Sequence, residues 1–566
     1  MNYEIWGVAL QVLILVLLSY PLGRYIATVY RGEKSFMDFL TPIENCIYKV
    51  CSIDPKEQMG WKRFLSVLLT LNLFWFVWGM VLVFIQGFLP LNPDGNVGQS
   101  ASQAFNTCIS FLVNCNLQHY SGENGLTYFT QIFVIMLFQF VTAATGMAAF
   151  AAVLKGMCAK TSTTLGNFWV YLIRTLTRIL IPLSMVVGML LIVGGTPMTL
   201  EGKQTITTLE GTEQVISQGP VAAIVAIKQL GTNGGGFFGV NSSHPLENPS
   251  YFTNMVECIS ILLIPMALIW CLGFYLKKRK FAACIFGVMF IAYITTVFIS
   301  VGQELGGNPK IAEMGISQLN GSMEGKEVRF GSGATALWAM TTTVTSNGSV
   351  NGMHDSLTPL SGMLTMLNMQ INCWFGGVGV GFMNYYIFII IAVFISGLMV
   401  GRTPEFLGKK IEAKEMKIAI MIALLHPFVI LCGTAIAAHL AVNDSELAAA
   451  WLSNPSFHGL SQMLYEFTSS AANNGSGFEG LSDNTPFWNI STGIALIVSR
   501  YLPIVAQVAI VGILAQKKYI SESAGTLKTD TVTFSVMTFA VIFIIAALSF
   551  FPALTLGPIA EYLTIR

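Results

Sequence analysis

Ten apolar stretches, each about long enough to cross a bilayer, dominate this chain of 566 residues. Only 10% of the residues are charged, against roughly 25% in an average soluble domain. A segment inside a membrane must satisfy its own backbone hydrogen bonds, as a helix does. The sequence therefore predicts an all-α polytopic membrane protein with about ten transmembrane helices. They are predicted at residues 5–28, 64–88, 126–154, 168–194, 251–276, 281–301, 367–400, 416–440, 488–515 and 531–555.

Basic residues mark alternate connections between the apolar stretches. Lys and Arg favour cytoplasmic loops, so we predict that the other connections and both termini face outward. The formal net charge of +1 gives no indication of a nucleic-acid partner. The basic connections lie around residues 31–63, 155–160, 277–280, 402–417 and 517–518.

Four of the outward connections contain a loop rich in Gly and Asn. Measured at Asn116, Gly234, Gly348 and Gly475, these loops are 118, 114 and 127 residues apart. Backbone conformations permitted to glycine can present carbonyl oxygens to a dehydrated monovalent cation. Extracellular turns also use Asn, Gly and Ser, but four loops in equivalent places favour a pore. The loops are residues 113–116, 232–236, 345–349 and 472–477.

A segment too short to span the membrane precedes each loop. These segments are amphipathic and about ten residues long, as is typical of re-entrant half-helices. The C-terminal carbonyls of such a helix carry a partial negative charge, which favours a nearby cation. The predicted half-helices are residues 102–112, 220–230, 334–343 and 458–467.

The chain thus divides into four pore units with one extra helix at each end. Irregular backbone at membrane depth is tolerated only where it is buried or lines a cavity, so the four loops should converge. We predict an N-terminal helix and its connection at 1–61, pore units at 62–160, 161–280, 281–415 and 416–518, and a C-terminal helix at 519–566.

A carboxylate follows every loop. A ring of such groups around an outer vestibule would concentrate cations, whereas each acid taken alone is equally well explained as an ordinary solvated loop charge. These residues are Glu123, Glu247, Asp355 and Glu479.

Several long runs in and around the loops resemble the KdpA family. That resemblance implies a fold similar to the Trk, Ktr and HKT potassium transporters and a place in the bacterial plasma (inner) membrane. It also implies that potassium enters from outside and moves sideways into KdpB, a P-type ATPase, with KdpC-like and KdpF-like small subunits completing the complex. The runs are GTNGGGFFG (231–239), NSSHPLENP (241–249), VNGMHDS (350–356), GRTPEFLGKK (401–410) and AANNGSGF (471–478).

The resemblance, carried over position by position, assigns twelve residues to a potassium filter. This chain departs from the expected family pattern at Cys115, Asn347 and Ser349, which makes the first and third loops unusual. The filter residues are Asn114, Cys115, Asn116, Thr232, Asn233, Gly234, Ser346, Asn347, Gly348, Asn473, Asn474 and Gly475.

Two features below the filter are candidates for gating or coupling. The glycines of residues 376–381, among them Gly377, Gly379 and Gly381, either pack helices closely or form a flexible break that gates the pore, as the resemblance favours. Arg500 lies mid-helix, where a charge costs about 3 kcal/mol. It is expected either to form an ion pair or to block cation leakage. We group Arg402 with these coupling residues.

Nothing in the sequence provides for ATP hydrolysis. Residues 321–326 are one residue short of a Walker A spacing and fall on the predicted outer side. We therefore expect no nucleotide on this chain, and potassium as its transported ligand. The residues alone leave open an ion-selecting pump subunit or a self-sufficient channel or symporter, and the resemblance favours the pump.

Overall fold

The computed structural model describes residues 3–399, 401–520 and 527–565. Within these ranges, ten helical spans are long and apolar enough to cross a membrane, and each overlaps a predicted segment. The all-helical membrane architecture is therefore confirmed. The spans are built from α1 (Tyr3–Arg31), α3 (Trp61–Ile85), α7 (Leu137–Cys158), α8 (Phe168–Thr175), α9 (Ile181–Val193), α11 (Tyr251–Tyr275), α12 (Arg279–Gly306), α16 (Val380–Met399), α17 (Ala413–Asn443), α20 (Pro486–Gln516) and α21 (Val532–Leu554).

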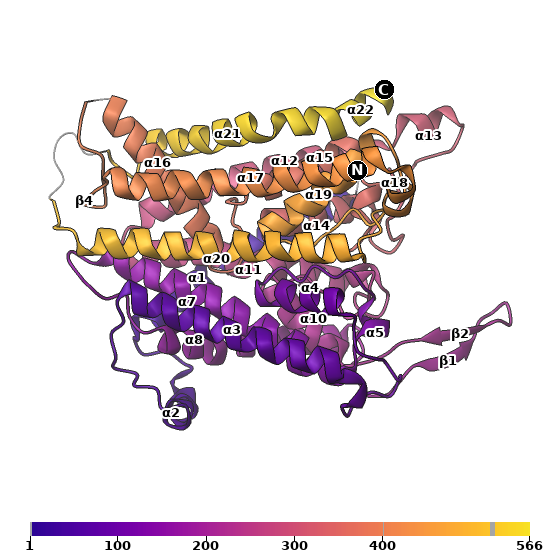
Figure 1. Ribbon diagram of the computed structural model, residues 1–566, viewed down its shortest axis with the longest axis horizontal. Helices are drawn as coiled ribbons and strands as arrows, with labels where there is room; N and C mark the ends of the chain where they lie inside the picture. The colour runs from indigo at the N-terminus through magenta and orange to yellow at the C-terminus, as the bar shows by residue number, and fades with distance from the viewer. Residues whose placement is uncertain (1–2, 400, 521–526, 566) are drawn as a thin grey trace.

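The connections separate to opposite ends of the helix bundle (Figure 1). The basic connections that contain α2 (Thr41–Val50) and β4 (Lys409–Lys410) lie in the left half of the view. The connections that contain β1 (Gln204–Thr207), β2 (Glu213–Ile216) and α18 (Ser445–Trp451) lie at the right end, as do both termini. This separation agrees with the alternation predicted from the basic residues.

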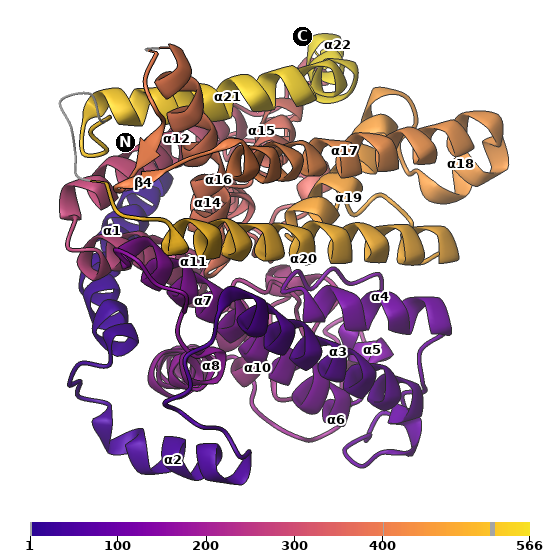
Figure 2. The same cartoon turned by 60° about the vertical axis from the view of Figure 1, so that its left-hand side comes forward.

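The interior of the bundle is formed by helices that carry few polar residues on any side. In α7 and α11, 72% of the most apolar window is buried, compared with 17% in α17. α20 lies between the N-terminal part of the chain and α17 (Figure 2), and it contacts α4, α7, α17 and α19. The loops carried by these helices are therefore held in the middle of the protein.

Four short helices lie between successive long ones. At 1.5 Å per residue they are about 15–24 Å long, which is less than the thickness of about 30 Å of a bilayer core. Two are longer than predicted, because their small and hydroxyl residues, such as those at 468–472, are buried rather than in a loop. The short helices are α4 (Ala101–Leu112), α10 (Val221–Leu230), α14 (Gly331–Val344) and α19 (Phe457–Ala472).

The predicted interruption in the segment 367–400 is present. Helix α15 (Pro359–Ile371) ends at Asn372, whose φ of 48° is left-handed, and α16 begins only at Val380. The intervening glycine-rich chain is irregular and buried.

Two small hairpins were not predicted from the sequence. β1 pairs with β2, and β3 (Glu405–Phe406) pairs with β4, both antiparallel. All four strands have at most four residues, too few for an alternating pattern to be recognised in sequence.

Candidate functional site

The four Gly/Asn loops meet, although at least 114 residues separate their reference positions. Glycines in three of the loops lie against a backbone carbonyl of the next loop, so closely that no side chain would fit. A Cβ atom built on any of them would approach that oxygen to well under 3.0 Å. The pairs are Gly234 with Asn347, Gly348 with Asn474, and Gly475 with Cys115.

The remaining junction joins the first and second loops and closes the ring. The side-chain amide of Asn114 donates to the carbonyls of Gly231 and Thr232, at 3.0 and 2.9 Å. Gly235 also lies against Asn116. The twelve residues assigned to the filter from sequence therefore belong to one ring of four loops.

The reference position has the same backbone conformation in every loop. φ is 91° at Gly234, 86° at Gly348 and 104° at Gly475, in the left-handed region that glycine enters freely. The first loop has no glycine, but Asn116 adopts a φ of 59°, and Asn tolerates this region better than most residues. The four loops thus share a left-handed reference position despite their uneven chemistry. Two residues earlier, φ is positive in the first, second and fourth loops but not at Ser346 in the third.

Asparagine side chains cap the neighbouring half-helices instead of facing an ion. The amide of Asn474 donates to the carbonyls of Thr342 and Thr345 at 2.7 and 3.3 Å. The amide of Asn347 donates to the carbonyl of Lys228 at 3.3 Å. These bonds satisfy carbonyls at helix C-termini that have no partner within their own helix. Backbone carbonyls are therefore left as candidate ligands, together with the side chain of Asn116, which is buried and has no hydrogen-bond partner among the described residues.

In three loops, the backbone carbonyl of the residue after the reference position faces a neighbouring helix. Each accepts a hydrogen bond from a buried side chain, which fixes the orientation of the loop. Ser110 Oγ donates to Leu117, Gln139 Nε2 to Gly235 and Trp338 Nε1 to Ser349, at 2.6, 3.2 and 2.8 Å. The carbonyl oxygens of Cys115, Asn347 and Asn474, in contrast, each lie beside the glycine of a neighbouring loop. A ring of carbonyls with this placement can replace the water shell of a monovalent cation.

A buried lysine supports the second loop. Lys228 Nζ is fully buried in α10 and contacts Glu247 Oε2 at 2.5 Å and Asn241 Oδ1 at 2.7 Å. Asn241 in turn donates to the carbonyl of Gly234 at 2.6 Å. Lys228 was not predicted as a functional residue, although a lysine six residues before Gly234, within an apolar half-helix, is a detectable signal.

Glu247 does not lie on an open vestibule. Its carboxylate is fully buried, pairs with Lys228, and accepts hydrogen bonds from the backbone N–H groups of Phe237 and Phe238 at 2.5 and 3.1 Å. The expected ring of four acids is therefore incomplete, because Lys228, six residues before Gly234, holds this carboxylate inside the protein.

The other three predicted acids differ from one another. Asp355 Oδ1 is 3.0 Å from His458 Nε2 and accepts from Gln462 at 3.0 Å, so it is paired rather than free. Glu123 is half-buried and accepts from the N–H of Gly239 at 2.8 Å. Glu479 is exposed and accepts from the N–H of Asp355 at 3.2 Å. Among the four acids, Glu479 alone is exposed.

Below the ring lies a small cavity. Ser346 and Asn473 of the loops line it from one side, and Arg500 of α20, only 6% exposed, lines it from another. Arg402 lies instead in an exposed turn before β3 and is not among the lining residues.

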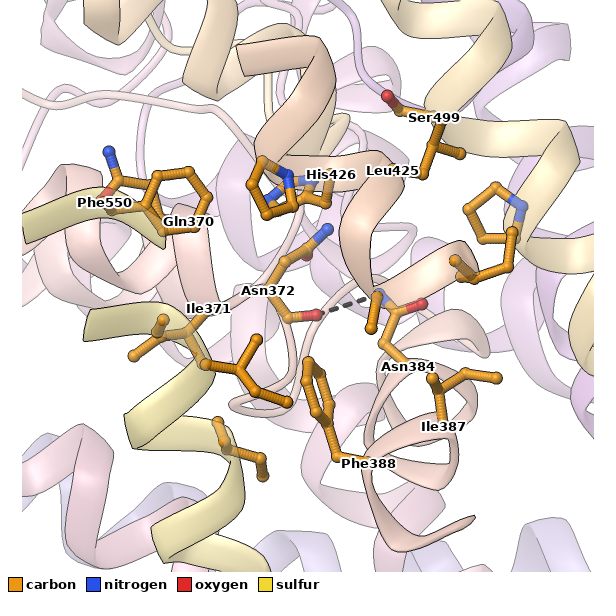
Figure 3. A pocket seen from close by; sticks show the side chains of 17 residues that line it. Gln370, Ile371, Asn372, Asn384, Ile387, Phe388, Leu425, His426, Ser499 and Phe550 are labelled. Carbon is orange, nitrogen blue, oxygen red and sulfur yellow. Dashed lines mark hydrogen bonds between the residues drawn. The ribbon is translucent and has the colours of Figure 1, made fainter. Parts of the chain in front are cut away.

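A second cavity adjoins the first and is lined by α15, α16, α17, α20 and α21 (Figure 3). Both cavities are lined by Asn372, Asn384 and Ser499. Figure 3 shows Asn384 donating to the backbone oxygen of Asn372, a bond of 2.9 Å. The side chain of Gln370, which also lines this space, has no hydrogen-bond partner among the described residues.

The glycine-rich break lies against the underside of the ring. The N–H of Val378 donates to Thr232 Oγ1 at 2.9 Å, and Gly377 lies beside Ser346. Gly379, with a φ of 86°, leaves no room for a Cβ beside the carbonyl of Gly146. Gly381 is equally crowded by the carbonyl of Phe375.

Comparison with known sequences decides the family. The family described as "Potassium-transporting ATPase A subunit" (KdpA) matches residues 9–563. The chain belongs to the KdpA family. Relatives from Bacteroides fragilis, Flavobacterium psychrophilum and Geobacillus kaustophilus are 70%, 58% and 46% identical over 100%, 100% and 98% of this chain, and over the same shares of their own. Each is named "Potassium-transporting ATPase potassium-binding subunit".

The fold of this KdpA-family chain also resembles a solved transporter. The potassium transporter TrkH from Vibrio parahaemolyticus aligns with a TM-score of 0.51 at 13% sequence identity, over 89% of this chain and 98% of TrkH. At this identity the likeness concerns the fold alone.

We predict that Gly234→Asp weakens potassium affinity by about tenfold or more, equivalent to at least about 1.4 kcal/mol, and reduces discrimination against rubidium. The Asp side chain would collide with the carbonyl of Asn347 and displace the ring. Uptake of potassium and rubidium into cells measures both quantities. The matched control is Gly211→Asp, since Gly211 is also left-handed but has open space around it. Equal affinity and discrimination in both variants would contradict this account of the ring.

We predict that Lys228→Met destabilises the purified protein by about 3–5 kcal/mol, because it leaves the carboxylate of Glu247 buried without a counter-charge. Glu247→Gln should also destabilise it. The double variant should be more stable than the Lys228→Met single variant, as a double-mutant cycle of thermal unfolding would measure. Strictly additive effects would mean that the two charges do not act as a pair.

Proposed function

We propose that this chain is the potassium-binding and potassium-translocating subunit of an ATP-driven uptake complex in the bacterial plasma membrane. The observation that carries the proposal is the closed ring of four loops, in which equivalent left-handed positions bring backbone carbonyls together. Membership of the KdpA family supports potassium as the cation.

In this proposal the ring belongs to four pore units. Each unit consists of a long helix, a half-helix, a filter loop and a returning helix, and α1 and α21 are the additional helices at either end. The half-helices α4, α10, α14 and α19 direct their C-terminal carbonyls toward the ring, where the helix dipoles favour a cation. Glu479, the exposed acid, faces the outer approach.

After the ring, potassium takes a lateral route through the two cavities. The guanidinium group of Arg500 at the first cavity disfavours a cation that continues straight toward the cytoplasm. The second cavity extends to α17 and α21, which are among the least buried spans. A KdpB-like P-type ATPase subunit receives the ion on that side, and KdpC-like and KdpF-like subunits complete the assembly.

The energy must come from the partner, because the chain has no recognised nucleotide-binding sequence. The alternative function, a self-sufficient channel or symporter, is supported by the similarity of the fold to TrkH. Family membership favours the pump subunit, since the relatives are named as subunits of a potassium-transporting ATPase.

The purified chain should bind potassium without hydrolysing ATP, and the complete complex should show potassium-stimulated hydrolysis. Isothermal titration with potassium chloride and a phosphate-release assay on both preparations measure these activities. Potassium-stimulated hydrolysis by this chain alone, shown by mass spectrometry to be free of partners, would contradict the proposal. Potassium transport by the chain alone in proteoliposomes, driven only by the ion gradient, would favour the channel.

The glycine-rich break is proposed as the gate below the ring. Gly379→Ala should reduce turnover strongly while the affinity for potassium changes less than threefold, because the added Cβ meets the carbonyl of Gly146 rather than a filter loop. Gly315→Ala is the matched control, since Gly315 also has a positive φ, of 78°, but has open space around it. Transport rate and potassium binding are measured side by side. Equal losses of both quantities in Gly379→Ala would indicate a packing role.

A further inference from the structure

Three side chains that could hold a metal ion lie beside the ring, near the junction of its first and fourth loops. His119 follows the first loop, Glu466 lies in α19, and Asp483 lies in the connection before α20. Their ligand atoms are all within 4.8 Å of one another. The side chains of His119 and Glu466 are 0% and 1% exposed, whereas Asp483 is 29% exposed. The cluster is therefore buried but accessible to an ion from the Asp483 side.

The spacing of the ligand atoms suits a small divalent ion. His119 Nε2 is 3.2 Å from Glu466 Oε1 and 3.8 Å from Asp483 Oδ2. Nitrogen and oxygen ligands at about 2.0–2.1 Å from a tetrahedral zinc ion lie about 3.3–3.4 Å from each other. Only small side-chain movements are needed to place all three ligands around one ion.

The tautomer of the imidazole is fixed by a second residue. Asn489 Oδ1 is 2.7 Å from His119 Nδ1. The amide nitrogen of Asn489 donates to Asn484 at 3.3 Å and to Ser102 at 3.4 Å, so its oxygen must face the histidine. His119 Nδ1 is then the donor. Nε2 faces the two carboxylates, so without an ion it carries a proton, which a bound ion would displace. Histidine ligands in metal sites are oriented in this way.

A second histidine in the same protein shows the contrasting arrangement. His458 also contacts two carboxylates, but on different ring nitrogens: Asp355 at Nε2, 3.0 Å away, and Glu561 at Nδ1, 2.9 Å away. One ion could not bind all three groups, so this cluster is an ion-pair bridge.

We infer that His119, Glu466 and Asp483 form a binding site for a divalent transition-metal ion of the zinc type, with Asn489 orienting the imidazole. One imidazole and two carboxylates are a donor set that suits such ions. The ion would connect the first loop to α19, near the junction of the first and fourth loops. At this junction Cys115 occupies the position that Asn347 and Asn474 occupy in the third and fourth loops. It would also neutralise two carboxylates near the ring. Bound zinc should therefore raise the apparent KM for potassium, a consequence that rests on the proposed function.

The binding test uses the purified intact complex and zinc chloride in chelator-free buffer. One zinc ion per chain is expected, measured by elemental analysis and by competition with a fluorescent zinc indicator. Asp483→Asn and His119→Gln should weaken zinc binding by about tenfold or more, whereas His458→Gln should bind as the wild type does. Asp483 is partly exposed, so its variant keeps the test valid if His119→Gln does not fold. No bound zinc in the wild-type complex, or unchanged binding in Asp483→Asn, would overturn the site.

The transport test separates this site from the proposed function. Zinc should raise the apparent KM for potassium uptake several-fold in the wild type, and this shift should disappear in Asp483→Asn. Zinc binding without any potassium transport by the complex would contradict the proposed function but not the site. Potassium transport without zinc binding would contradict the site alone.

Discussion

Irregular backbone buried at the centre of a membrane protein must find its hydrogen-bond partners inside the protein, and the ring of four loops depends on this constraint. Side chains from neighbouring elements supply those partners. The amides of Asn114, Asn347 and Asn474 cap carbonyls of adjacent loops and half-helices. Each of these amides reaches across a junction, so three of the four junctions are tied by side-chain hydrogen bonds. At the remaining junction, between the fourth and first loops, Gly475 lies against the carbonyl of Cys115.

The ring is not symmetric in what surrounds it. The second loop is supported by the buried pair of Lys228 and Glu247, joined through Asn241 to the carbonyl of Gly234. At the junction of the fourth and first loops, Cys115 occupies the position that corresponds to Asn347 and Asn474 in the other loops. A buried ion pair behind one quarter of the ring and a thiol at another make the quarters chemically distinct, although all four share a positive φ at the reference position.

The fold could be predicted largely from the sequence, because hydrophobic length and loop spacing are local signals. The ten spans and the break after α15 followed from apolar runs and glycine content. The exact lengths of α14 and α19 could not be predicted, because the Gly, Ser and Thr residues at their ends have low helix propensity and only their burial in the folded protein stabilises the helix there. The hairpin of β1 and β2 was too short to leave a periodic pattern.

The candidate site was predictable only in part, because pairing between distant side chains has no local signature. Gly234, Gly348 and Gly475 could be recognised as equivalent from their spacing. That Glu247 turns inward to Lys228, or that Asp355 pairs with His458, depends on contacts across helices. For the same reason the sequence did not predict that His119 lies beside Glu466 and Asp483, because both acids follow His119 by more than 340 residues.

The most direct test of the central claim is a structure of the complex soaked with thallium, a potassium substitute with strong anomalous scattering. The account predicts an anomalous peak on the axis of the ring, within coordination distance of backbone carbonyls from all four loops. Weaker peaks are expected in the cavity below. A ring without anomalous density, with thallium bound only elsewhere, would contradict it.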